Sequence, residues 1–192
     1  MGDNAEILSA LDDAPRWLVT DWGGPGGVAK VSISVGGRVT DVTIHDNRAA
    51  YDGQSVALGS GGLARLLHEV QTMLDEQALS TPAARVTVAG LVDLWRTTPD
   101  DGTGRWSLRH GLIEWHCTDG LLHIEAGDGG PYATPLAQPL VDVLRDLGWN
   151  SPDDNFRNCW LQPPAEALES AARIAVLTTV TAFGYPEPPA LP

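Results

Sequence analysis

Apolar and polar residues alternate along two stretches in the first quarter of the chain, "VAKVSISV" (28–35) and "RVTDVTIH" (38–45). An alternation of period two is typical of a strand with one buried face. The glycine pair at 36–37 suits the two-residue turn of a hairpin. The sequence therefore predicts a β-hairpin over 28–45. Its apolar residues do not all fall on one face by simple counting, which predicts a β-bulge in this strand pair.

The stretch over 59–77 has the longer period of a helix. Its apolar residues recur at the i, i+3, i+4, i+7 spacing of an amphipathic helix, with Ser60 as the N-cap. These apolar positions are Leu63, Leu66, Leu67, Val70, Met73 and Leu74. A shorter helix is predicted over 3–13. Over 81–95 the pattern favours a helix that begins at a Thr-Pro pair, with a strand as the alternative.

A polar segment with Pro and Gly, "TTPDDGTG" (97–104), separates these elements from the rest and predicts a boundary between two halves. Beyond it, three stretches predict strands, over 106–111, 112–118 and 121–127. The dipeptide Asp119-Gly120 supplies a hairpin turn between the last two. The second half is therefore expected to begin with an antiparallel sheet.

Two helices are predicted after these strands. The first begins at Thr134-Pro135 and ends before Gly148, and the second begins at Pro163-Pro164 and ends at Gly184. Proline in the first turn and glycine just past the last turn are the usual start and stop residues of helices.

Strands followed by helices in both halves predict an α+β fold, with antiparallel sheets and flanking helices in two halves of similar size. We expect an N-terminal half over 1–97 and a C-terminal half over 105–185, either as separate domains or as one layered fold. The proline-rich end, 186–192, is expected to be extended or disordered.

Charge narrows the choice of partners. The chain carries 12 Lys and Arg against 25 Asp and Glu, a net charge of −13. Residues 1–100 hold 7 basic and 13 acidic side chains, and residues 101–192 hold 5 and 12. Nucleic acids require a basic footprint for their phosphates, so this balance argues against them as partners. Without a long apolar run or a signal-peptide pattern, and with two cysteines, the expected location is the cytoplasm, away from membranes.

Ligand-type side chains gather on the predicted strands of the second half. Glu114, His116, His123 and Glu125 share one face if the hairpin register suits. Such a face is either a metal site or a solvated row of paired polar side chains. The Cys and His spacings of zinc sites do not appear cleanly, which favours the solvated row. No phosphate-binding loop or nucleophile motif is found, so neither a cofactor nor an enzyme is expected. An enzyme built on these four residues is an alternative.

The seven tryptophans outnumber the two phenylalanines and three tyrosines together. Tryptophan has a large apolar body and one N–H, and it serves both in cores and as an anchor in binding grooves. The segment "LGWNSPDDNFRNCW" (147–160) carries two of them between predicted helices. The candidate client-binding residues are Trp106, Trp115, Trp149, Phe156 and Trp160.

The order of residues in "LRDLGWNSPDDNFRNCW", followed by a helix and "AFGYPEPPAL", resembles a known family. A Leu-Gly-Trp helix end, an acidic pair, an Asn-x-Trp, a long helix and an aromatic-Gly-aromatic-Pro ending are similar to the C-terminal segment of the TY-Chap family of actinobacteria. These are predicted peptide-binding chaperones grouped with type III secretion chaperones and YbjN. The resemblance covers about residues 105–188. It implies an antiparallel sheet with flanking helices that holds peptides on its surface, without catalytic residues.

The first half resembles a different group. "GVAKVSISVGGRVTDVTIHDNRAAYD", followed by a helix, is similar to the YbaB-type nucleoid-associated fold over about residues 25–78, whose second strand has a Gly-x-Val-Thr-x-Val-x-Ile pattern. This resemblance implies a homodimer and, for some members, DNA binding. The even negative charge opposes DNA binding.

The combined expectation is a non-enzymatic, chaperone-like protein that binds a peptide or protein client and is associated with secretion. It would bury apolar client side chains on a Trp-bearing surface, or accept a client strand at an edge such as 28–35 or 121–126. The alternative is a YbaB-like protein, either associated with the nucleoid and DNA or acting as a dimeric architectural protein.

Overall fold

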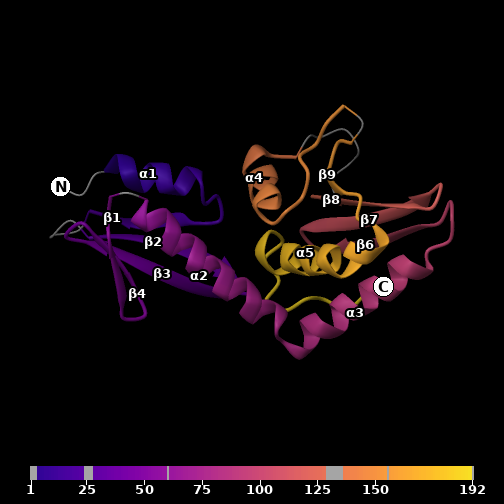
Figure 1. The fold of residues 1–192 in the computed structure, drawn as a ribbon, viewed down its shortest axis with the longest axis horizontal. Helices are drawn as coiled ribbons and strands as arrows, with labels where there is room; N and C mark the ends of the chain where they lie inside the picture. Colours follow the sequence, from indigo (N-terminus) through magenta and orange to yellow (C-terminus); the bar gives the residue numbers. More distant parts are fainter. Residues whose placement is uncertain (1–3, 24–27, 60, 129–135, 155, 192) are drawn as a thin grey trace. The chain divides into compact units, whose positions relative to one another are not determined.

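The structure, a computed structural model, describes residues 4–23, 28–59, 61–128, 136–154 and 156–191. Within these residues it has two antiparallel sheets, of five and four strands, and five α-helices, so the fold is α+β as predicted (Figure 1). The chain divides into two compact units, Met1–Glu76 and Gln77–Pro192. No helix of the described part is long and apolar enough to cross a membrane.

The first unit is a five-stranded antiparallel meander with helices at its two ends in sequence. Its strands, in both chain and spatial order, are β1 (Leu18–Trp22), β2 (Ala29–Val35), β3 (Arg38–His45), β4 (Arg48–Tyr51) and β5 (Gln54–Ala57). Helix α1 (Asn4–Asp12) precedes them, and α2 (Gly62–Leu79) follows them. Strands β1, β4 and β5 were not predicted from the sequence.

The predicted hairpin is confirmed as β2 and β3, with both turn glycines at positive φ. Its register places Val31 opposite Val42 and buries both side chains. Val39 pairs with Ser34 on the other face, where it is 69% exposed, so the uneven count of apolar residues needs no bulge. The prediction of a bulge in this pair is wrong. The irregularity lies instead between β1 and β2, at Val19/Asp21.

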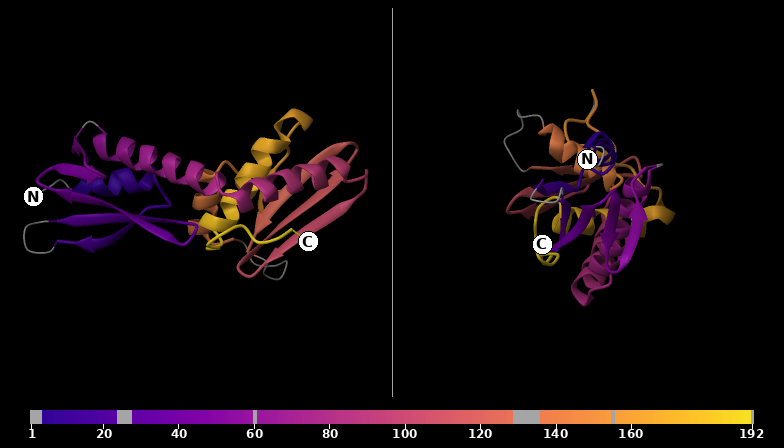
Figure 2. Two further views of the ribbon diagram at one scale, coloured as in Figure 1. Left: turned by 90° about the horizontal axis from the view of Figure 1, so that it is seen from below. Right: turned by 90° about the vertical axis from the view of Figure 1, so that its left-hand side faces the viewer.

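Helix α2 runs along the five-stranded sheet (Figures 1 and 2). Five of its six predicted apolar positions are buried, and the sixth, Met73, is 36% exposed. Two polar contacts that periodicity cannot reveal also hold the helix. Trp17 Nε1 donates to Gln71 Oε1 at 3.1 Å, and the Arg16 guanidinium donates to both Asp75 oxygens at 2.8 Å. The predicted cap, Ser60, lies outside the described residues.

The second unit has a four-stranded antiparallel sheet. Its strands are, in order, β6 (Thr103–Leu108), β7 (Gly111–Thr118), β8 (Leu121–Gly127) and β9 (Cys159–Leu161). Its helices are α3 (Pro82–Thr97), α4 (Gln138–Asp146), the 3₁₀ turn η1 (Ala165–Ala167) and α5 (Leu168–Thr181). The three longer strands were predicted. The short β9, which lies inside the segment 147–160, was not.

The region that allowed either a helix or a strand is the helix α3. Thr81 caps it, because its Oγ1 accepts a hydrogen bond from the Ala84 N–H at 3.2 Å. Helix α3 packs on α5, so it belongs to the second unit. The 97–104 segment is also tied to the sheet, since Asp101 N–H donates to Cys117 O at 2.8 Å. The unit boundary therefore lies at Glu76/Gln77, and the expected halves 1–97 and 105–185 are corrected accordingly.

Helix α5 is the centre of the second unit. Most of its residues are buried, including Thr178 and Thr179, as expected of a helix enclosed by other elements, and it lies over the sheet in Figure 2. The sheet face that shares this core carries Trp106, Ile113, Trp115, Ile124, Ala126 and Cys159. The opposite sheet face carries the charged side chains Arg105, Glu114 and Glu125.

Helix α4 ends as predicted at Gly148, whose φ of 106° suits glycine. Trp149 N–H donates to Leu144 O, and Gly148 N–H donates to Arg145 O, which together form a Schellman motif. The motif reverses the chain and directs Trp149 into the core. The predicted start, Thr134-Pro135, lies outside the described residues.

The proline-rich end is extended but packed. Trp106 Nε1 donates to Ala190 O at 3.0 Å. The side chain of Leu191 lies so close to Gly90 that a Cβ there would come within 2.6 Å of it. Residues 186–191 form neither helix nor strand, and these contacts hold Ala190 and Leu191 against the rest of the second unit.

A candidate binding face on the C-terminal sheet

Three of the five candidate aromatic residues are part of the core. Trp106, Trp115 and Trp149 are at most 5% exposed. Each indole N–H also has an acceptor: Ala190 O for Trp106, Thr98 Oγ1 for Trp115 at 3.2 Å, and Thr178 Oγ1 for Trp149 at 2.8 Å. The prediction that these three side chains contact a client is therefore corrected. Strand register and the Schellman motif turn their rings inward.

The other two candidates, Phe156 and Trp160, are half-buried on the outer face of the sheet. Trp160 belongs to β9, directly opposite Glu125 of β8. Its neighbour Cys159 faces the core and is fully buried. Alternation along the strand thus separates the two residues, and only the tryptophan is available to a partner.

The register of β7 and β8 brings the four ligand-type residues onto this same face. Glu114 lies opposite Glu125, and His116 lies opposite His123. The expectation that these side chains share one face is confirmed. The sequence did not predict that Trp160 and Phe156 would join them.

Aromatic rings form a continuous cluster around His123. Its imidazole stacks on Phe156, with ring centroids 4.1 Å apart and planes 24° from parallel. Trp160 lies 5.7 Å from the same imidazole, and 5.1 Å from Phe156. The His116 ring approaches from the other side at 4.9 Å. His123 is consequently 4% exposed, although it shares its face of the sheet with the charged Glu114 and Glu125.

Burial lowers the pKa of His123 below its ordinary value of 6.5. Nearby His116 lowers this pKa further, while the Asp153 carboxylate raises it. The imidazole is therefore neutral at physiological pH. Its Nε2 is buried without a hydrogen-bond partner in the described part of the chain, and it faces Glu125 Oε1 at 3.8 Å.

The segment 150–158 holds Phe156 in place. Asn150 and Trp160 exchange two backbone hydrogen bonds, of 2.9 and 3.1 Å, which anchor the segment at both ends. Within it, Phe156 N–H donates to Asp153 Oδ1 at 3.0 Å. Asn158 Nδ2 donates to Glu125 Oε2 at 3.0 Å and links the segment to β8. The only hint of this in the sequence was the turn-forming composition of "SPDDN".

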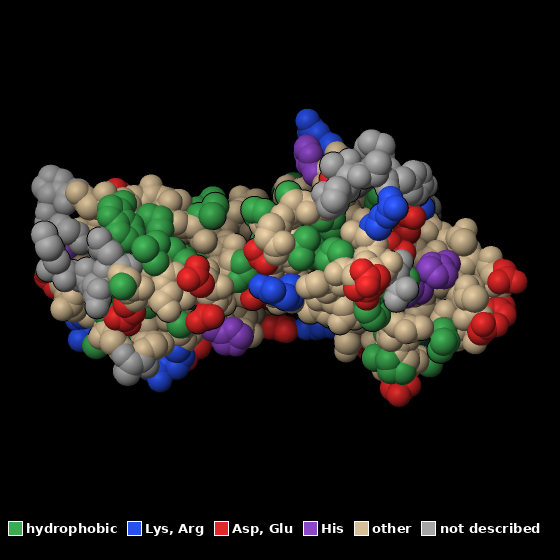
Figure 3. All heavy atoms as spheres, turned by 90° about the horizontal axis from the view of Figure 1, so that it is seen from above, with side chains coloured by type: hydrophobic (Ala, Val, Ile, Leu, Met, Phe, Trp, Pro, Cys, Tyr) green, Lys and Arg blue, Asp and Glu red, His purple; other side chains and the backbone are tan. Residues whose placement is uncertain are grey.

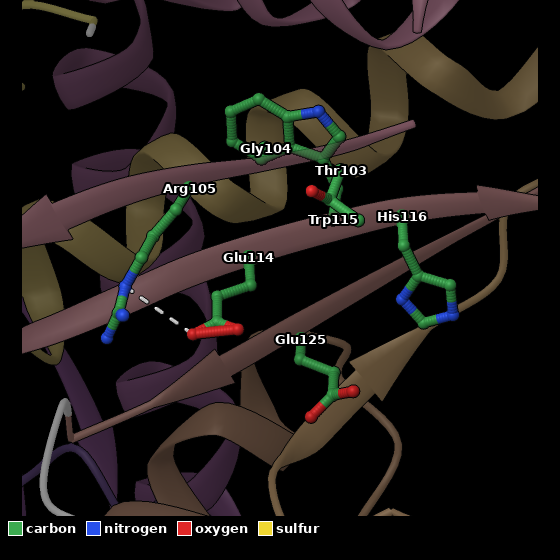
Figure 4. A pocket seen from close by; sticks show the side chains of 7 residues that line it. All are labelled: Thr103, Gly104, Arg105, Glu114, Trp115, His116 and Glu125. Carbon is green, nitrogen blue, oxygen red and sulfur yellow. Dashed lines mark ion pairs between the residues drawn. The ribbon is translucent and has the colours of Figure 1, made fainter. Parts of the chain in front are cut away.

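An open pocket of about 500 Å³ lies on the outer face beside this cluster. It is lined by Thr103, Gly104, Arg105, Glu114, Trp115, His116 and Glu125. Figure 4 shows Glu114, His116 and Glu125 extending to the same side of the sheet, while the Trp115 ring points the other way. Arg105 Nε lies 3.5 Å from Glu114 Oε1. Arg105 was not among the predicted site residues, because an exposed arginine on a strand has no distinguishing pattern.

The arrangement of these side chains does not resemble a metal centre or a nucleophile site. Across the described residues, no three His, Cys, Asp or Glu side chains converge as metal ligands would. His116 and His123 meet ring to ring instead of directing nitrogens at one point. Burial raises the pKa of Cys159 to about 11, which keeps its thiol protonated and unreactive.

A second hollow, of about 400 Å³, lies in the same unit near the β7–β8 turn and the start of η1. Its lining is more apolar, with Trp95, Leu121 and two prolines. Two of its polar groups are already used, since Asp100 accepts from Gly120 N–H and Thr98 accepts from Trp115. The outer-face pocket is lined by charged side chains from three strands, Arg105, Glu114 and Glu125, and is therefore the stronger candidate.

The mixture of acidic and basic side chains on the surface agrees with the even spread of charge along the sequence. On the face drawn in Figure 3, basic side chains occur in small separate groups with acidic ones among them.

Comparisons with protein-family models, with curated proteins and with solved structures find no match for the chain. Its function is therefore inferred from the geometry of the outer face.

Proposed function

We propose that the protein binds an extended peptide segment of a protein client on the outer face of its C-terminal sheet. The observation that carries this proposal is an open pocket beside an edge strand. Strand β6 is the first strand of the sheet order, and it contributes Thr103 and Arg105 to the pocket. A client strand that adds to β6 thereby places alternate side chains directly over the pocket.

The free edge of β6 supplies the backbone groups for such an addition. Among the described residues, no backbone hydrogen bond joins β6 to any segment other than β7. In an antiparallel ladder, alternate residues direct their N–H and C=O groups away from the neighbouring strand. Cys117 N–H donates to Gly102 O, so Gly102 directs its backbone groups towards β7. Every second residue from there does the same, which leaves the N–H and C=O groups of Arg105 and Ser107 directed away from β7.

The two edges named from the sequence do not serve this purpose. Residues 28–35 form β2, which lies between β1 and β3, and residues 121–126 lie in β8, between β7 and β9. β2 is therefore paired on both sides, and in β8 the residues Ile124, Glu125 and Ala126 are already paired with β9, which leaves only a short stretch of that edge. The edge strand β6 takes their place in the proposal.

Binding of labelled peptides tests this proposal. The panel consists of soluble peptides in which Thr and Val alternate around one central residue, and fluorescence anisotropy reports binding. Ser107→Pro removes one outward N–H from β6, so we expect about tenfold weaker binding, on the order of the loss of one good hydrogen bond. The matched control, Ser107→Ala, keeps the N–H and is expected to bind as the natural protein does.

Saturable binding by at least one peptide, weakened in Ser107→Pro and retained in Ser107→Ala, supports the proposal. Unchanged thermal unfolding of both variants shows that the sheet itself is intact. If no peptide of the panel saturates, or if the proline leaves affinity unchanged, the client does not bind by addition to β6.

A further inference from the structure

Two carboxylates face each other in the pocket. Glu114 and Glu125 occupy directly opposed positions on β7 and β8. Like charges at such positions destabilise a sheet unless a cation compensates them. One cation is present, since Arg105 pairs with Glu114. The pocket consequently retains negative charge on the side of Glu125.

Glu125 is only partly satisfied. Its Oε2 accepts from Asn158, a neutral amide, while its Oε1 faces the His123 Nε2 at 3.8 Å, beyond hydrogen-bond distance. The His123 side chain is 94% buried, and this nitrogen has no partner in the described residues. A buried polar group without a partner is uncommon in proteins and calls for an explanation. The unpaired nitrogen therefore lies next to the incompletely used carboxylate of Glu125, which itself lines the pocket.

Aromatic surface adjoins this carboxylate. Trp160 lies directly opposite Glu125 in the β8–β9 pair, and its ring contacts Phe156. Both rings are half-buried, so each keeps an accessible part. Cationic side chains bind over aromatic faces, and their alkyl stems cover apolar surface while the charged group reaches a carboxylate.

We infer that the pocket recognises a basic side chain, Lys or Arg, of the client peptide. This inference rests on the proposed function and specifies its substrate class. The charged group of the client donates to Glu125 Oε1, with Glu114 adding attraction, while its stem lies along Trp160 and Phe156. Neutral His123 contributes no positive charge that would compete for Glu125.

The peptide panel, with Lys, Arg, Gln or Glu as the central residue, tests the inference. We expect the Lys and Arg peptides to bind about tenfold more tightly than the Gln peptide, the scale of one hydrogen bond to a charged group. Glu125→Gln keeps an oxygen for Asn158 but removes the charge, and it is expected to abolish that difference. The matched control is Glu166→Gln, an exposed glutamate of η1 in the same unit, which is expected to keep it.

The outcomes separate the inference from the proposed function. Equal affinity for the Lys, Arg and Gln peptides, or unchanged preference in Glu125→Gln, overturns the inference and leaves strand addition standing. Absence of binding by every peptide overturns the proposed function itself. Preference for the Glu peptide assigns the pocket to Arg105 instead and also overturns the inference.

Discussion

His123 is a buried histidine whose ring nitrogen Nε2 has no hydrogen-bond partner among the described residues. It lies on an outward-facing strand position, yet three aromatic rings and the segment 150–158 bury it. An unpartnered buried nitrogen costs on the order of 1–3 kcal/mol, which ring stacking and apolar burial around it offset. A phenylalanine side chain at this position would stack on the same rings. The histidine side chain differs from it by placing a polar nitrogen next to Glu125.

The pH dependence of stability follows from this residue. The folded-state pKa of His123 lies below the ordinary value of 6.5, so the unfolded chain takes up the proton first as the pH falls. The stabilising contribution is complete above about pH 6.5 and is lost as the pH falls from there towards the lowered folded pKa. We predict that the free energy of unfolding falls less steeply between pH 7 and about pH 5 in His123→Phe than in the natural protein.

Chemical denaturation at several pH values measures that slope. The other charged groups near the imidazole, His116, Asp153 and Glu125, are present in both proteins, so the two proteins differ at one titratable side chain. Identical slopes would show that the His123 imidazole titrates normally in the folded protein.

Trp149 gives a prediction for the core. Its indole N–H donates to Thr178 Oγ1, and both residues are buried. Trp149→Phe should lower the free energy of unfolding by about 1–3 kcal/mol, because it removes the bond and reduces packing. Thr178→Val removes the same bond from the other side. The double variant should therefore cost less than the sum of the two single changes, and strict additivity would contradict the assigned hydrogen bond.

Peptide binding by the core variant is informative as well. Since Trp149 lies beneath the sheet and not on its outer face, Trp149→Phe should keep the affinity of the natural protein as long as the variant is folded. A selective loss of affinity without loss of stability would restore Trp149 as a client-contacting residue.

At the level of elements, the packing of Trp115 against β6 requires a glycine at position 104. The ring of Trp115 lies across Gly104, and a Cβ at this position would come within 2.2 Å of the ring. We predict that Gly104→Ala destabilises the second unit by about 1–3 kcal/mol, the usual cost of overpacking. Thermal unfolding of Gly104→Ala and Ser107→Ala, two alanines on one strand, makes the comparison. Equal stability of these variants would contradict the packing of Trp115 over β6.

Periodic patterns predicted the long elements well. A clear period of two or 3.6 residues can be recognised in the longer elements: β2, β3, β7, β8, α2 and α5. The short β4, β5 and β9 show none, because three or four residues cannot establish a period. The β7–β8 hairpin also predicted the shared face of Glu114 and Glu125, since the turn at Asp119-Gly120 sets the register.

The position of the tryptophans could not be predicted in this way. Trp115 and His116 are neighbours in sequence and face opposite sides of one sheet, and only the packing of α5 decides which side is the core. Likewise Trp160 approaches His123 because β9 pairs with β8, and Phe156 stacks on the same imidazole. Such contacts depend on tertiary structure. The sequence favoured Trp149 and Trp160 alike because they bracket one loop, although Trp149 is buried and Trp160 lies on the outer face.

For the whole molecule, the relevant property is the negative charge. A protein of net charge −13 attracts basic partners at long range and repels acidic ones. We predict that the affinity for the Lys-centred peptide falls as salt rises from about 0.05 to 0.5 M, while the affinity for the Gln-centred peptide changes little, because screening acts on charged pairs. Anisotropy titrations at several salt concentrations measure both. A parallel response of the two peptides would contradict charge recognition.

Amide hydrogen exchange, with and without the Lys-centred peptide, tests the central claim most directly. Strand addition predicts slower exchange at Arg105 and Ser107 of β6, whose N–H groups would gain partners. The exposed edge strand β1 of the first unit, with Leu18 67% exposed, provides an internal comparison and should be unaffected. Unchanged exchange at β6, or protection of β1 in its place, would contradict the claim that the C-terminal sheet holds the client.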